Sequence, residues 1–119
     1  MSMRTFRVTV RGVFDGLTED QRAALLADAA AHDVLRAAFT PEGTLTYDIA
    51  ARPAFVFRFS ATGEEEEDIL EATERAEAAA EAWLTERGYG FRNLRSSAED
   101  LSQAPLSKRQ RRAARSAEA

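Results

Sequence analysis

The sequence predicts an α+β domain in which two amphipathic helices pack on one face of a mostly antiparallel sheet. Two segments, Arg4–Phe14 and Pro53–Phe59, alternate apolar and polar residues with the period of two that a half-buried strand requires. Two other segments each begin with a capping box and continue with apolar residues three to four positions apart, which is typical of amphipathic helices. Two amphipathic helices on one face of an antiparallel-rich sheet are typical of the α+β class.

The first two elements are a strand and a helix. Arg4–Phe14 is expected to turn its apolar residues toward the core and its polar residues outward. Gly12 and Gly16 mark the turn that follows. Thr18, with Gln21 three residues later, forms a capping box and predicts a helix that ends at His32-Asp33.

Three strands are expected next. Val34–Thr40 and Thr44–Ala50 are predicted to form a hairpin, because the short segment Pro41-Glu42-Gly43 between them contains a glycine. Pro53 opens the third strand, in which aromatic residues alternate with Val56 and Arg58. The residues expected to face the core in these strands are Leu35, Ala37, Phe39, Leu45, Tyr47, Ile49, Phe55, Phe57 and Phe59.

A second helix and a last strand complete the predicted domain. Thr62 and Glu65 form a capping box, and the acidic run Glu64–Asp68 favours a helix start because it faces the positive end of the helix dipole. Gly88 is expected to end this helix in the left-handed conformation, before a final strand at Tyr89–Leu94. The predicted order, β-α-β-β-β-α-β, is that of a ferredoxin-like variant with an extra strand.

Charge is divided along the chain. The whole chain carries a net charge of −4, and ten of its twenty acidic residues lie between Glu64 and Glu86. We expect residues 1–105 to form one compact domain and residues 106–119 to form a basic, flexible tail. The basic residues of this tail outnumber its one acid by four; they are Lys108, Arg109, Arg111, Arg112 and Arg115.

The composition excludes several classes of site. The chain has no cysteine, which excludes disulfides and thiolate chemistry, and its single histidine, His32, makes a transition-metal site improbable. No run of about 18 apolar residues could span a membrane. The N-terminus has no signal-peptide core, because Arg4, Arg7 and Arg11 interrupt its apolar residues. We expect a cytoplasmic protein without metal or cofactor.

Four segments together resemble a small actinobacterial family of unknown function. They are RTFRVTVRGVFDGLT, FTPEGTLTYDIAARPAFVFRF, AEAWLTERGYGFRNLR and SQAPLSKRQRR, and they span nearly the whole chain. The resemblance implies a compact single domain. It supplies no activity, substrate or site residue.

Two surfaces are candidates for contact with a partner. The clustered cations of the tail are typical of segments that bind RNA or the ribosome, although a solubilising tail or one lying on the acidic helix has the same composition. The second candidate is the sheet face opposite the helices, which is expected to be solvated or paired across a homodimer. Its arginines are predicted to be Arg7, Arg11, Arg36 and Arg58.

A small enzyme of the ferredoxin-like type is a further alternative. Its acid–base group would be Tyr47, Asp48 and Arg58. This hypothesis requires a cavity of a few hundred Å³ lined by Tyr47 and Arg58, whereas a filled core would exclude it. Because no convergent polar site is evident, the sequence favours a non-catalytic interaction module that acts as a homodimer through its sheet face or its acidic helix.

Overall fold

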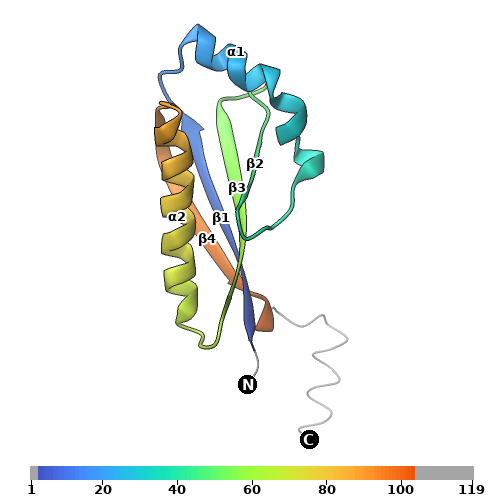
Figure 1. Cartoon of the computed structure of the whole chain (residues 1–119), viewed down its shortest axis with the longest axis vertical. Helices are drawn as coiled ribbons and strands as arrows, with labels where there is room; N and C mark the ends of the chain where they lie inside the picture. Colours follow the sequence, from blue (N-terminus) through green and yellow to red (C-terminus); the bar gives the residue numbers. More distant parts are fainter. Residues whose placement is uncertain (1–2, 104–119) are drawn as a thin grey trace, which may run out of the picture.

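The computed structural model describes residues 3–103, and the predicted tail at 106–119 lies outside this range. Its main elements follow the order β-α-β-β-α-β (Figure 1). They are β1 (Arg4–Phe14), α1 (Glu19–Ala27), β2 (Thr44–Tyr47), β3 (Ala54–Gly63), α2 (Asp68–Glu86) and β4 (Phe91–Asp100), with the 3₁₀ helices η1 (Ala29–His32), η2 (Val34–Arg36) and η3 (Leu101–Gln103).

The four strands form one antiparallel sheet in the order β2-β3-β1-β4. The α+β class is therefore confirmed, with one strand fewer than predicted. The ferredoxin-like assignment stays a prediction, and the element order β-α-β-β-α-β supports it.

One face of the sheet carries the core. The strands β1 and β3 pair along almost their whole length, from Arg4 opposite Gly63 to Val13 opposite Ala54. Alternate residues of both strands are therefore buried on the same face, as the period of two predicts. The buried apolar residues of the three strands that build this core are Phe6, Val8, Val10, Phe14, Leu45, Tyr47, Phe55, Phe57 and Phe59.

Both helices contribute to this core. Ala72, Ala76, Ala80 and Leu84 form the buried side of α2, and the small alanines let the helix approach the sheet closely. Helix α1 lies over one end of the sheet and adds Leu25 to the same cluster (Figure 1).

The strand predicted at 34–40 does not form. The carboxylate of Asp33 accepts a 2.8 Å hydrogen bond from the backbone N–H of Leu35, and η2 begins there. Such local bonds compete with strand pairing because they satisfy the backbone within the segment. Leu35, predicted to face the core, is 91 % exposed, and only Thr40 makes an isolated bridge to Phe59.

The second helix begins later than predicted. The prediction of a capping box at Thr62 and Glu65 is wrong, because β3 stays paired with β1 as far as Gly63. The carboxylate of Asp68 instead accepts hydrogen bonds from the backbone N–H groups of Glu64, at 2.9 Å, and Glu65, at 3.0 Å. These bonds lower the pKa of Asp68 and fix the turn that leads into α2.

Other predicted boundaries are confirmed. Thr18 and Gln21 form the capping box of α1 through reciprocal hydrogen bonds. At the end of α2, Gly88 has a φ of 72°, and the N–H of Tyr89 donates to the carbonyl of Leu84 at 2.9 Å.

The last strand is longer than predicted. It runs from Phe91 to Asp100, beyond the predicted end at Leu94, and η3 follows. The register of β4 on β1 is regular from Asp100 to Arg95 and shifts beyond it, near Asn93, whose φ is 56°.

A candidate interaction surface on the open face of the sheet

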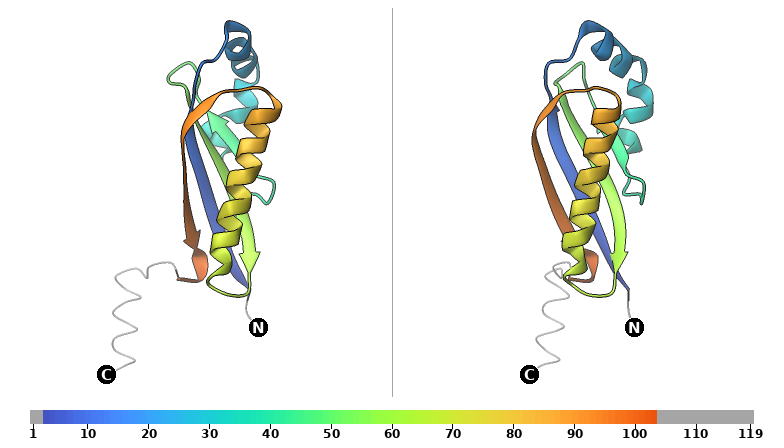
Figure 2. Two further views of the ribbon diagram at one scale, coloured as in Figure 1. Left: turned by 90° about the vertical axis from the view of Figure 1, so that its left-hand side faces the viewer. Right: turned by 60° about the vertical axis from the view of Figure 1, so that its left-hand side comes forward.

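The sheet face opposite the core is here called the open face. In the left view of Figure 2, α2 lies on the other side of the sheet. Beside β2, residues of α1, η1 and η2 border the open face around Thr46 and Arg58. The register shows which charged residues share this face, because directly opposed residues of an antiparallel pair point to the same side. They are Arg7, Arg11, Arg58, Arg92, Arg95 and Glu99.

The open face therefore carries five arginines and one glutamate. Arg7 stands opposite Glu99, but Arg11 stands opposite Arg95. Two like charges at directly opposed positions repel each other and destabilise a strand pair. This repulsion marks the open face as a place where an anion would be bound favourably.

No ion pair within the described part of the chain neutralises these arginines. The ion pairs there join Arg4 to Asp100 at 2.8 Å, Arg75 to Glu71, and Arg87 to Glu86 at 4.0 Å. None of them involves an arginine of the open face.

Two of the open-face arginines are held in place by neighbours. Arg58 donates a 2.7 Å hydrogen bond from Nη1 to Oγ1 of Thr46, on the neighbouring strand. The guanidinium carbon of Arg7 lies 5.0 Å from the centroid of the Phe39 ring, a cation–π contact. Each guanidinium has five N–H donors, so these contacts orient both groups and leave donors for a partner.

The opposite side of the domain is acidic. The segment from Glu64 to Arg87, which includes α2, holds ten acids and two arginines. Most of these acids are exposed, among them Glu71, Glu74 and Glu81. The domain therefore has one basic side, the open face, and one acidic side, the outer surface of α2.

The sequence prediction located part of the open face. Arg7, Arg11 and Arg58 lie on it as expected, whereas Arg36 lies in η2, outside the sheet. Arg95 and Glu99 were missed because the last strand was predicted to end at Leu94. The alternation continues to Asp100, but it is hard to recognise because the inward positions there are Ser96 and Ala98 rather than large apolar residues. The predicted tail residues, Lys108 to Arg115, lie outside the described range.

Comparison with known proteins assigns the chain to a family. The model described as "Family of unknown function (DUF6204)" matches residues 1–112. The chain belongs to DUF6204. No curated protein and no solved structure matches it. Membership of DUF6204 brings no activity with it.

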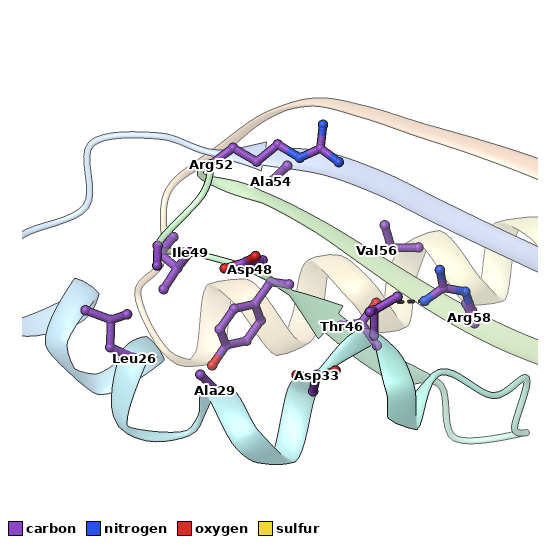
Figure 3. Close-up of a pocket in the computed structure, with 13 residues that line it drawn as sticks. Leu26, Ala29, Asp33, Thr46, Asp48, Ile49, Arg52, Ala54, Val56 and Arg58 are labelled. Atoms are coloured by element: carbon purple, nitrogen blue, oxygen red, sulfur yellow. Dashed lines mark hydrogen bonds between the residues drawn. The ribbon is translucent and has the colours of Figure 1, made fainter.

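This DUF6204 domain also has a groove at the end of the sheet near β2. Its volume is about 460 Å³, and its lining includes Tyr47, Asp48 and Arg58 (Figure 3). The cavity that the small-enzyme hypothesis requires is therefore present. The same groove is lined by Arg52 and by Asp33, which gives it charges of both signs.

Two of the three residues of the small-enzyme hypothesis, Tyr47 and Arg58, form hydrogen bonds within the domain. The hydroxyl of Tyr47 donates a 2.6 Å hydrogen bond to the carbonyl of Leu25, and burial, together with Asp28 and Tyr89, raises the pKa of Tyr47 to about 12. Arg58 donates to Thr46. A phenol with so high a pKa is a poor general base near neutral pH.

His32 has a structural position beside this groove. Its Nδ1 lies 3.0 Å from the carbonyl oxygen of Leu45, and because a carbonyl can only accept, Nδ1 carries the hydrogen. The ring stacks on Tyr47 with centroids 5.2 Å apart. His32 lies in the last turn of η1, whereas α1, which was predicted to end at His32-Asp33, ends at Ala27. Among residues 3–103, every helix is too short or too polar to cross a membrane.

Proposed function

We propose that the domain is a non-catalytic interaction module that binds an acidic protein segment on its open face. The observation that supports this proposal is the arrangement of five arginines against one glutamate on the sheet face opposite α2. None of these arginines is ion-paired within the described residues.

Carboxylates suit this surface chemically. A guanidinium binds a carboxylate through two parallel N–H···O bonds, which makes such pairs stronger than ordinary hydrogen bonds. A carboxylate placed between Arg11 and Arg95 would replace their repulsion with two attractions. Because Arg7 and Arg58 are already oriented by Phe39 and Thr46, less side-chain entropy is lost on binding.

An acidic protein fits better than a nucleic acid. Single-stranded RNA is commonly bound by aromatic residues that project from the strands, and here Phe6, Phe55 and Phe57 all point into the core. The net charge of −4 and the acidic surface of α2 would also repel a long polyanion that extends beyond the sheet.

Contact between the open faces of two copies is disfavoured, because it would bring two strongly basic surfaces together. The predicted homodimer therefore needs a different contact, which is considered below.

The proposal can be tested by fluorescence anisotropy with a labelled oligoglutamate peptide and a labelled single-stranded oligonucleotide. We expect the full chain to bind the peptide, and the double variant Arg7→Glu/Arg11→Glu to lose at least about tenfold in affinity. Arg22→Glu is the control, because Arg22 is exposed on α1 and is not part of the open face. It should bind almost as well as the wild type.

Three outcomes would contradict the proposal. The first is no binding of the peptide, and the second is an equal loss in the control and the open-face variant. The third is binding of the oligonucleotide in preference to the peptide, which would favour the nucleic-acid alternative.

A further inference from the structure

The strand β4 leaves one long edge of the sheet unpaired within the described residues. It pairs with β1 along one side, and it stands last in the strand order. Both views of Figure 2 show β4 at the margin of the sheet. An unpaired edge presents backbone N–H and C=O groups that can pair with another strand.

The other edge strand is better protected. Strand β2 has only four residues, and the contact between His32 and the Leu45 carbonyl occupies part of its outer edge. Short edges and covered edges are the usual ways in which proteins prevent edge-to-edge pairing. Strand β4, with ten residues, lacks both forms of protection among the described residues.

The charges of β4 are self-complementary. On the open face its regular part presents, in order, Arg95, Ser97 and Glu99. If two copies of β4 pair antiparallel with Ser97 on the two-fold axis, Arg95 of each copy stands opposite Glu99 of the other. Opposite charges at directly opposed positions stabilise an antiparallel pair.

Neighbouring registers lack this match. Moving the axis to Ser96 places Arg95 opposite Ser97, and moving it to Arg95 places two copies of that arginine opposite each other. The Ser97 register also keeps both charged positions inside the regular part of the strand, which begins at Arg95 and ends at Asp100.

We propose that two copies of this chain pair through their β4 edges, antiparallel and with Ser97 at the two-fold axis, to form one continuous eight-stranded sheet. Such an isologous contact is the commonest form of dimer. In it, Glu99 of the second copy lies beside Arg95 and offsets the repulsion that Arg95 experiences from Arg11. The contact leaves Arg7, Arg11 and Arg58 of both copies available to the proposed acidic segment, whereas Arg95 takes part in both proposals.

Light scattering coupled to size exclusion, together with sedimentation at several concentrations, tests this dimer. We expect the full chain to be a dimer, and Arg95→Glu and Glu99→Arg each to raise the dissociation constant by about tenfold or more. The exchanged variant Arg95→Glu/Glu99→Arg should restore dimerisation, because it re-forms both ion pairs with their signs reversed. Arg22→Glu on α1 serves as the control and should leave the dimer intact.

The variant Arg95→Glu also separates dimerisation from folding. Within one copy the new glutamate faces Arg11, so a repulsive pair becomes attractive and the folded monomer should gain stability. Loss of the dimer together with retained or raised thermal stability supports the proposal. A monomer at high micromolar concentration, a dimer that neither single variant weakens, or an exchanged variant that stays monomeric would each overturn it.

Discussion

The hydroxyl of Tyr47 donates a 2.6 Å hydrogen bond to the backbone carbonyl of Leu25, and this bond joins the edge strand β2 to helix α1. Both residues are buried, with exposed fractions of 7 % and 2 %. A carbonyl buried in this way loses its hydrogen bond to water on folding, so the tyrosine hydroxyl replaces that partner.

Removing this hydroxyl should destabilise the domain. We expect Tyr47→Phe to lower the free energy of unfolding by about 1–3 kcal/mol, because the Leu25 carbonyl is left without a partner. Urea denaturation followed by circular dichroism measures the change. Tyr89→Phe is the matched control, since Tyr89 is only partly buried, and it should change the stability by less than about 0.5 kcal/mol. Equal effects of the two substitutions would contradict this prediction.

The same tyrosine should make the domain sensitive to alkali. Its pKa is raised from 10.0 to about 12 in the folded state. Between these values the unfolded chain binds fewer protons at this position than the folded chain, so the free energy of unfolding falls as pH rises above 10. We expect the wild type to lose more stability than Tyr47→Phe between about pH 8 and about pH 11. Parallel pH profiles of the two proteins would show that Tyr47 is not the cause.

Asp68 should contribute stability in the opposite pH range. Its hydrogen bonds with Glu65 and Glu64 hold its pKa below the usual 3.8, so its contribution is present above that value and is lost as pH falls through the folded pKa. We expect Asp68→Ala to lower the denaturation midpoint at neutral pH, with a difference from the wild type that shrinks in acid. A difference that stays constant with pH would indicate that the carboxylate charge is not involved.

Gly43 should be intolerant of a side chain. Its φ of 89° is unfavourable for other residues, and a Cβ at this position would meet the ring of the buried Phe59. We expect Gly43→Ala to cost about 2 kcal/mol or more in thermal or urea unfolding. Gly88→Ala is the control, since φ is similar there but the nearest atom, Nε2 of Gln21, lies 3.9 Å away. If both variants lose the same stability, the contact with Phe59 is not responsible.

Two leucines distinguish the observed fold from the predicted hairpin. Leu35 and Leu45 were both expected to face the core, but Leu35 is 91 % exposed and Leu45 is 6 % exposed. We expect Leu45→Ala to cost about 2–5 kcal/mol and Leu35→Ala to change the free energy of unfolding by less than about 0.5 kcal/mol. A large loss for Leu35→Ala would show that the segment after Asp33 packs as the sequence pattern suggested.

The elements that the sequence predicted well are those with strong local signals. Strand β1 has a strict alternation over its whole length, and the Thr18–Gln21 capping box begins α1 as expected. The errors occur where a longer-range contact or a single side-chain bond decides the structure. Pairing with β1 extends β3 to Gly63, so the predicted Thr62–Glu65 capping box does not form. The hydrogen bond of the Asp33 carboxylate caps η2 in the segment that was predicted to be a strand.

The open face could be predicted only in part for the same reason. Arg7 and Arg11 follow directly from the alternation of β1. Their relation to Arg95 and Glu99 depends on the register between β1 and β4, which no local pattern specifies. The cation–π contact of Arg7 with Phe39 could not be predicted either, because Phe39 was expected in the core.

The separation of charge between the open face and the surface of α2 gives the domain an electric dipole moment directed through the thickness of the sheet. The electric field of this dipole rotates an approaching charged molecule before contact. For an acidic molecule, it favours encounters with the open face over encounters with the surface of α2. Added salt should slow association much more than it changes the rate of dissociation, because screening acts on the approach rather than on the close contacts. Orientation during the encounter is thus set by the division of charge between two layers, although the chain as a whole is acidic.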